Sequence, residues 1–272
     1  MPTNRPFSRL SGPGDTPRAE PSGHPEQPGA LQGEIWLTLQ TRQAQQLIRG
    51  RSATPDKPTI IGLIGFADRL RLIWQAARGD DPYADWWLIQ VHEAIARTAS
   101  AIHRRHVELD QQRAQMTALA VSVAASERPY RVQLQFANPY AYRGAQLLAD
   151  YDRLVCAALT ARHIGLLDGQ ACGNLQSACA RKLRAVFMLP QRYRFLKIDR
   201  AAVRTHTGSS HAARQAMGEV PADILSGERQ APLVPRKMKF PTGIAGGVGL
   251  HSESAGCRTK HADAEDPENH DS

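Results

Sequence analysis

Residues 130–136 alternate apolar and polar side chains without interruption. The apolar positions are Tyr130, Val132, Leu134 and Phe136, and the polar positions are Arg131, Gln133 and Gln135. Successive side chains of a strand point to opposite faces, so a period of two predicts a β-strand with one apolar and one polar face. The backbone groups along the edges of a lone strand need a partner strand. The choice of that partner therefore constrains the fold.

Two helices are predicted directly after this strand. Asn138 and Pro139 are an N-cap and a first-turn proline, which are typical of a helix start. Apolar residues at spacings of three and four predict one helix over 139–161 and another over 170–189, separated by a turn that contains two glycines. A strand followed by two helices is the layout of a ribbon-helix-helix DNA-binding protein, one of the β-ribbon readers.

The ribbon-helix-helix layout supplies both a partner strand and a mechanism. In such a dimer the strand pairs with the same strand of a second chain, and the two form an antiparallel ribbon that enters the major groove. Arg can pair bidentately with guanine and Gln with adenine, so the predicted base readers are Arg131, Gln133 and Gln135. The sequence thus predicts a mainly helical, ribbon-helix-helix type homodimer with a short intersubunit antiparallel β-ribbon. A twofold dimer in turn predicts a palindromic operator.

The positive charge of the chain is concentrated in the same region. The whole chain has a formal charge of +8, and residues 128–204 contain 13 Lys and Arg against four Asp. Such a segment attracts polyanions, and double-stranded DNA fits the pattern, although a basic surface without a partner is the alternative. The predicted phosphate contacts are Arg128, Arg143, Arg162, Gln170, Asn174, Arg181, Lys182 and Arg184. Gln170 and Asn174 belong to this set because the first turn of a helix presents backbone N–H groups to an anion.

The remainder of the chain divides by composition. Residues 1–32 contain seven prolines among polar residues and are predicted to be disordered, as is the polar, glycine-rich tail over 205–272. Residues 33–126 are predicted to form an N-terminal helical region, with a weakly alternating segment at 35–39, a helix over 61–78 and a longer helix after Pro82 that continues, with a break, towards Val123. We expect this region to brace or extend the dimer formed by the DNA-binding region over 127–204.

Several classes of function lack support in the sequence. No run of 18 apolar residues occurs, which argues against a membrane span, and residues 1–6 lack the apolar core of a signal peptide, so we expect a cytoplasmic protein. His92-Glu93 lacks the second His of a zinc-protease motif, and Asp80-Asp81 is better explained as a helix cap than as an acid–base pair. The four unevenly spaced cysteines fit thiols in a reducing compartment. No catalytic set, metal site or cofactor is predicted, so the sequence does not favour an enzyme.

A distinctive run of residues begins at that aspartate pair: Asp80-Asp81-Pro82-Tyr83-Ala84-Asp85-Trp86-Trp87-Leu88. Together with 36–41, 49–51, 60–63, 66–67 and 159–167, it resembles the AcaB-like family of proteins carried by integrative and conjugative elements. The resemblance covers roughly residues 33–200. It implies a ribbon-helix-helix transcriptional regulator of conjugative transfer genes, in agreement with the strand pattern.

The predicted function is sequence-specific DNA binding by a transcriptional regulator of a conjugative or integrative mobile element. The alternative is a structural or partner-binding protein of the conjugative transfer machinery, in which the ribbon serves only dimerisation. Binding to duplex DNA without sequence preference, or no binding at all, would favour this alternative.

Overall fold

Long helices make up most of the chain in the computed structural model, which describes residues 33–56, 58–116, 118–206 and 208–237. The fold described here is that of the unit that begins at Glu34. Its elements are β1 (Ile35–Leu39), α1 (Arg42–Arg49), β2 (Gly50–Arg51), β3 (Ile60–Ile61), α2 (Leu63–Arg78), α3 (Pro82–Ala114), β4 (Tyr130–Leu134), α4 (Pro139–His163), α5 (Gly169–Met188), the 3-10 helix η1 (Leu189–Arg192), α6 (Arg200–Arg204), α7 (Gly208–Met217) and α8 (Ala222–Ser226).

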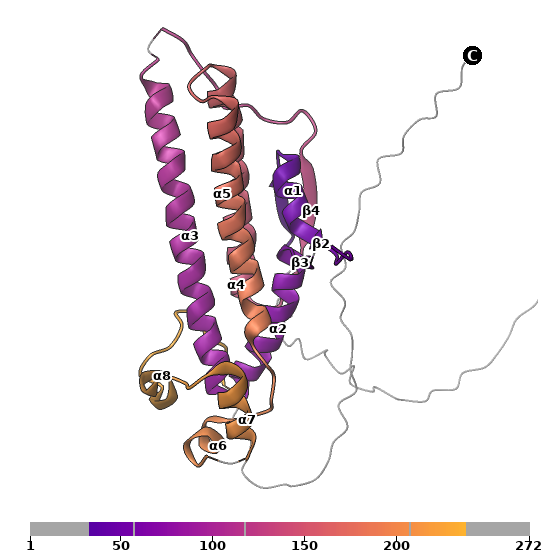
Figure 1. The fold of residues 1–272 in the computed structure, drawn as a ribbon, viewed down its shortest axis with the longest axis vertical. Helices are drawn as coiled ribbons and strands as arrows, with labels where there is room; N and C mark the ends of the chain where they lie inside the picture. Colours follow the sequence, from indigo (N-terminus) through magenta and orange to yellow (C-terminus); the bar gives the residue numbers. More distant parts are fainter. Residues whose placement is uncertain (1–32, 57, 117, 207, 238–272) are drawn as a thin grey trace, which may run out of the picture. The chain divides into compact units, whose positions relative to one another are not determined.

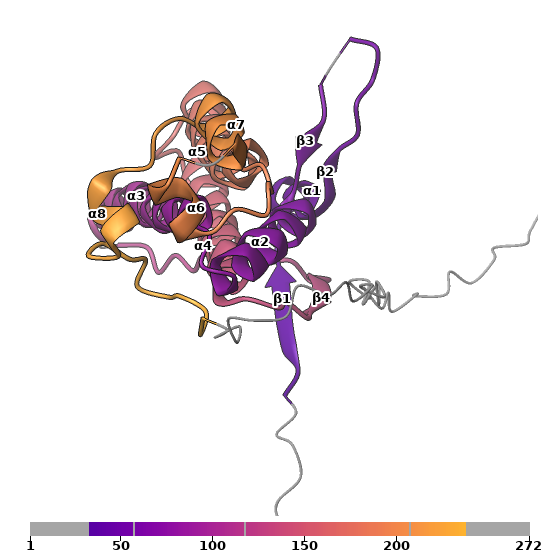
Figure 2. The same cartoon turned by 90° about the horizontal axis from the view of Figure 1, so that it is seen from below.

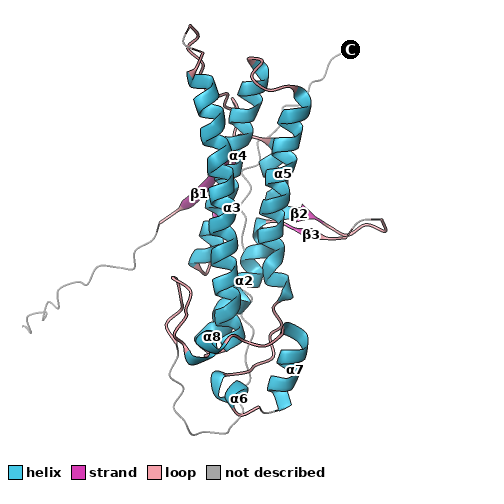
Figure 3. Cartoon of the chain, turned by 60° about the vertical axis from the view of Figure 1, so that its left-hand side comes forward, coloured by secondary structure: helices cyan, strands magenta, loops and turns pink. Residues whose placement is uncertain are grey.

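Three of these helices, α3, α4 and α5, run lengthwise beside one another, and α2 packs against them (Figures 1 and 3). The 33 residues of α3 give a helix about 50 Å long at 1.5 Å per residue. The core between the helices holds fully buried aromatic rings, among them Phe66 of α2 and Phe187 of α5, whose centroids lie 5.1 Å apart. Helices from both predicted regions, 33–126 and 127–204, therefore share one core.

Short polar side chains begin the long helices, as the sequence predicts. Asp81 accepts hydrogen bonds from the backbone N–H groups of Tyr83 and Ala84, and Pro82 occupies the first turn of α3. The side chain of Asn138 caps α4 in the same way before Pro139. The first of these caps confirms the prediction that the Asp80-Asp81 pair marks a helix start. The long helix of the N-terminal region ends earlier than expected, at Ala114, and an irregular segment leads from there to β4.

The strand predicted over 130–136 is confirmed for Tyr130–Leu134, but its expected partner is wrong. β4 pairs antiparallel with β1 of its own chain, in the register Ile35↔Leu134 to Leu39↔Tyr130. The weakly alternating segment 35–39 supplies this partner because it also has an apolar face, and the two strands bury Leu37, Leu39, Val132 and Leu134 together. The ribbon is therefore formed within one chain, and a second copy is not needed to satisfy these backbone groups.

A second two-stranded sheet is formed by β2 and β3, which pair antiparallel and lie at the base of a long hairpin. Figure 2 shows β1 and this hairpin extending from the helices in roughly opposite directions, with α1 near the hairpin base. Among the described residues, no helix combines the length and the apolar composition needed to cross a bilayer.

The segment after α5 is more ordered than its composition suggests. We expected a disordered tail over 205–272, but residues 208–226 contain α7 and α8, which pack with α6 at one end of the long helices (Figures 1 and 3). Buried Met217 and Ile224 attach them to the core. The prediction was wrong for this part because a few apolar residues, spaced for short helices, suffice when a larger core is already present. The disorder predicted for 1–32 and for the rest of the tail, 238–272, lies outside the described residues.

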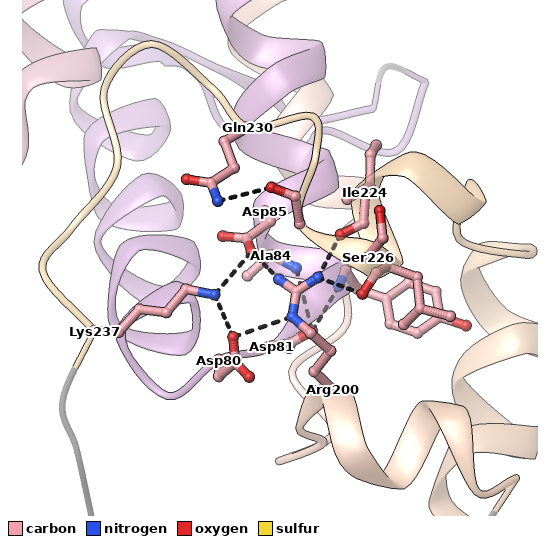
Figure 4. Close-up of polar contacts among 12 residues, drawn as sticks. Asp80, Asp81, Ala84, Asp85, Arg200, Ile224, Ser226, Gln230 and Lys237 are labelled. Carbon is pink, nitrogen blue, oxygen red and sulfur yellow. Dashed lines mark hydrogen bonds and ion pairs between the residues drawn. The ribbon is translucent and has the colours of Figure 1, made fainter.

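An ion-pair cluster holds this C-terminal segment to the start of α3 (Figure 4). The guanidinium group of Arg200 donates to Asp80 (3.2 Å) and Asp85 (2.5 Å), and also to backbone carbonyl oxygens of α8. Lys237 forms a second ion pair with Asp80. Burial by itself would raise the pKa of Asp80, but the nearby cations Lys237 and Arg200 outweigh it, so the pKa of Asp80 is lowered. Asp85 is more enclosed, and there burial raises the pKa. The cluster thus joins residues more than 100 positions apart in the sequence.

Candidate nucleic-acid interface

The β1–β4 ribbon presents one polar face to solvent. On β4, Arg131 is exposed and Gln133 is partly exposed, while Val132 and Leu134 are buried. Gln135, just past the strand, is exposed. On β1, Trp36 and Thr38 are the outward residues. Arg131 and Gln133 therefore lie on one outward face, as the alternation of the sequence implies, while Gln135 is exposed beyond the end of the strand.

Contacts across the ribbon fix the position of Arg131. Thr38 lies opposite Arg131 in the strand register, and Trp36 lies opposite Gln133. The guanidinium carbon of Arg131 is 5.2 Å from the centroid of the Trp36 ring, which is a cation–π distance. The indole N–H of Trp36 in turn donates to the Glu34 carboxylate at 3.0 Å. The arginine side chain is thus oriented over an aromatic ring before any ligand arrives.

A buried carboxylate anchors the ribbon to the helices. Asp152 of α4 is 2% exposed and accepts hydrogen bonds from the backbone N–H groups of Gln40 (2.6 Å) and Thr41 (2.9 Å) and from the Thr41 hydroxyl (2.6 Å). These residues form the junction between β1 and α1. Thr41 also caps α1, since its hydroxyl oxygen accepts the Ala44 N–H at 3.3 Å. One aspartate therefore sets both the end of the ribbon and the start of the next helix.

The solvent side of α1 has the same chemistry as the ribbon. Its buried residues are Ala44, Leu47 and Ile48, and its exposed residues are Arg42, Gln43, Gln45, Gln46 and Arg49. The exposed side of this helix is thus made of Arg and Gln, without an acidic residue. This face belongs to the helix that follows β1 in the sequence, and it is basic and rich in side-chain amides.

The predicted phosphate contacts are distributed over several surfaces. Arg128 is exposed just before β4, and Arg143 is exposed near the start of α4. Asn174 and Lys182 of α5 line a groove between α5 and α3. Arg104 and Arg105 of α3 line the same groove. The other members of the set are exposed Arg162, Gln170 and Arg181, and partly exposed Arg184.

The start of α5 differs from the expectation of free N–H groups. The Asp168 carboxylate accepts the Ala171 N–H at 2.7 Å, and the Gln170 side chain donates to Asn174 at 3.1 Å. The chain itself thus supplies the anion that a helix start favours.

The thiols of Cys156, Cys172 and Cys179 are free and buried, as the sequence predicts, while Cys257 lies outside the described residues. Burial raises the pKa of Cys156 to about 11, so this thiol is a poor nucleophile at neutral pH. Within the described ranges, no three His, Cys, Asp or Glu side chains are placed to hold a metal ion.

Residues 27–237 match the model of the protein family described as "Transcriptional regulator AcaB". The chain belongs to the AcaB family. The match covers all the described helices and strands, and so includes the ribbon, α1 and the ion-pair cluster. The resemblance noted in the sequence is thereby confirmed. The most specific part of that resemblance is the run over residues 80–88. In this member of the AcaB family, the run contains the N-cap and the first turns of α3. It also supplies the carboxylates that bind Arg200 and Lys237.

One similar solved structure is the crystal structure of selenomethionine-containing AcaB from uropathogenic E. coli. It is 12% identical in sequence to this AcaB-family chain, with a TM-score of 0.48, and the alignment covers 72% of this chain and 95% of that one. Among curated proteins, the chain has no match.

Three features of the interface were not anticipated from the sequence. Trp36 and Thr38 were missed because the segment 35–39 alternates weakly and carries no charge on its polar side. The basic face of α1 lies outside the region with the positive excess. Asp152 did leave a signal, since it is an acidic residue within the apolar stripe of α4.

Proposed function

We propose that this chain is a sequence-specific DNA-binding regulator of transcription that reads the major groove of double-stranded DNA with the β1–β4 ribbon. The observation that carries the proposal is the outward face of β4, on which Arg131 is exposed and Gln133 partly exposed, with exposed Gln135 just past the strand. Membership in a family of transcriptional regulators supports it. The family resemblance further favours genes of a conjugative or integrative mobile element as the target.

A ribbon formed within one chain suits this role. The major groove admits a two-stranded β-ribbon, and the sheet of β1 and β4 has that form. Arg131 would pair with guanine, and Gln133 and Gln135 with adenine. The Trp36 ring holds the guanidinium group in place, so less side-chain freedom is lost on binding than for an unsupported arginine.

Phosphate contacts would flank the reading face. Arg128 lies just before β4, Arg143 lies near the start of α4, and both are exposed, so they are the first candidates. The exposed arginines of α1, Arg42 and Arg49, add to them. The remaining candidates are Arg162, Gln170, Asn174, Arg181, Lys182 and Arg184. Each phosphate contact releases counterions, so binding should weaken steeply with salt.

We further propose that the regulator acts as a homodimer. The β1–β4 sheet has two strands, so each strand retains one edge that is not paired to another strand within the described part of the chain. Pairing of such edges between two copies would give a longer intersubunit sheet and two reading faces. Light scattering of the free protein, together with the symmetry of its binding site, tests the dimer.

The test of base reading compares two arginines of equal charge. Footprinting on the DNA of the mobile element first identifies the bound site, and mobility-shift titrations then compare Arg131→Ala with Arg97→Ala. Arg97 lies on α3 with its side chain 71% exposed and pairs with Glu93, and it serves as the control. A bidentate arginine–guanine contact contributes about 1–3 kcal/mol, so Arg131→Ala should weaken binding roughly 5- to 150-fold and relax the preference at one base pair. Arg97→Ala should change affinity less than about twofold.

Wild-type affinity and preference in Arg131→Ala would refute base reading by the ribbon. The alternative is a partner-binding protein of the transfer machinery. Exposed Ile35 (45%) and Trp36 (42%) favour it, because exposed apolar side chains at a sheet edge are typical of protein contacts. Binding to duplex DNA without sequence preference would support this alternative, and so would a complete lack of duplex binding.

A further inference from the structure

A polar cleft of about 480 Å³ lies between α1, α5 and the β2–β3 hairpin. Two guanidinium groups line it, those of Arg51 and Arg184, and no acidic residue belongs to its lining. Its volume falls within the range of about 300–1,000 Å³ that is typical of small-molecule sites. A cleft lined by two cations and by no acidic residue is suited to an anion.

The two helices contribute matched stripes of side chains. On α5, Gln176, Ala180 and Arg184 follow one another at spacings of four and line one wall. On α1, Gln43 and Gln46 lie three apart and line the opposite wall. Side chains at these spacings lie on one face of a helix, so the amides and the guanidinium group project into the same space.

The hairpin closes one end of the cleft, and two glycines hold it there. A Cβ atom on Gly50, whose φ is +77°, would lie 2.0 Å from the Ile60 carbonyl oxygen, and one on Gly62 would lie 2.4 Å from the Ile48 carbonyl oxygen. The strands can therefore approach the end of α1 so closely only with glycine at both positions. Arg51, the residue after Gly50, is steadied by a hydrogen bond from its guanidinium group to the Pro58 carbonyl oxygen at 3.2 Å.

The remaining lining is largely apolar and buried. Leu47, Ala180 and Tyr151 are each less than 10% exposed, and Ile60 is partly exposed. A flat heteroaromatic group can pack on such a surface while its polar edge meets side-chain amides. Gln is well suited to that edge because it offers both a donor and an acceptor.

We propose that this cleft binds a phosphate-bearing nucleotide. Arg51 and Arg184 hold the phosphate group, the Gln43, Gln46 and Gln176 amides meet the edge of the base, and the apolar lining packs against its ring. The phosphate can come from a free nucleotide or from a DNA strand, and the two arms of the test separate these sources. Tyr151 lines the cleft and directly precedes Asp152, so an occupant would lie beside the anchor of the ribbon.

The first arm uses no DNA and does not depend on the proposed DNA binding. Isothermal titration of the full chain with AMP, GMP, CMP, UMP and inorganic phosphate measures binding directly. Arg184→Ala and Arg51→Ala should each weaken binding of the preferred nucleotide at least about tenfold, which corresponds to loss of about 1.4 kcal/mol. Arg181→Ala is the control, because Arg181 is an exposed cation of the same helix that does not line the cleft. Binding with this pattern supports a free nucleotide.

The second arm measures the salt dependence of duplex binding with the same three variants. If a DNA phosphate fills the cleft, Arg184→Ala and Arg51→Ala should each reduce the slope of log K against log [salt] by about one, and Arg181→Ala should not. Loss of slope without nucleotide binding assigns the site to DNA phosphate. The proposal is overturned if no nucleotide or phosphate binds and the three variants have equal slopes. It is also overturned if all three weaken nucleotide binding equally.

Discussion

Replacement of Asp152 by Ala tests whether this one carboxylate holds the ribbon to the helical core. The side chain is almost fully buried and accepts three hydrogen bonds at the β1–α1 junction, two from backbone N–H groups and one from a hydroxyl group. With alanine in its place, the hydroxyl of Thr41 can rotate towards another acceptor. The N–H groups of Gln40 and Thr41 cannot, because the chain fixes their direction.

The expected loss follows from these bonds. A hydrogen bond to a charged group contributes about 1.5–3 kcal/mol, and a buried donor left without a partner costs about 1–3 kcal/mol. Two stranded donors therefore predict that Asp152→Ala lowers the free energy of unfolding by about 3–5 kcal/mol, since such terms are not fully additive. Asp152→Asn keeps one acceptor oxygen and should lose roughly half as much.

Urea unfolding followed by circular dichroism measures the loss. Asp150→Ala is the matched control, because Asp150 lies on the same helix and, within the described residues, forms polar contacts with the side chains of Gln146 and Arg153 near the surface. Such a pair contributes less than about 1 kcal/mol. The reasoning is refuted if Asp152→Ala loses no more than Asp150→Ala. If Asp152→Ala remains folded, the weakened β1 anchor should also reduce DNA binding.

Two further predictions concern the helical core and the start of α3. A Cβ atom on Gly144 would lie 2.5 Å from an aromatic ring of α2, so Gly144→Ala should destabilise the fold by about 1–3 kcal/mol despite its better helix propensity. Gly173 has open space, so Gly173→Ala should stabilise the fold by up to about 1 kcal/mol. Urea midpoints that shift in the same direction for both variants would contradict one of the two assignments. Burial raises the pKa of Asp81 from 3.8 to about 6, against the opposing effect of a hydrogen bond from Tyr193. The folded state then binds the proton more tightly than the unfolded state, so the contribution of Asp81 to stability falls as pH rises from about 4 to about 6. Asp81→Asn should flatten the measured pH dependence of unfolding in that window, and an unchanged slope would show that Asp81 is not its source.

Local signals in the sequence determined the elements of this protein. The alternation over 130–136 predicts a strand with a polar outer face, and that face is where Arg131 lies. Asp81 and Asn138 mark helix starts because a short acceptor side chain satisfies free N–H groups only at such a position. These features depend on neighbours within a few residues, so they can be read from the chain alone.

Only the tertiary structure decided which elements meet. Every strand presents the same backbone donors and acceptors, so the sequence of β4 does not specify whether it pairs with β1 or with a second copy. The choice depends on which apolar faces can be buried together, and β1 satisfies β4 within the chain. The same holds for Asp152, Arg200 and the cleft residues, whose partners come from distant segments. Their side chains acquire a role only when the helices have packed and removed the alternative partner, water.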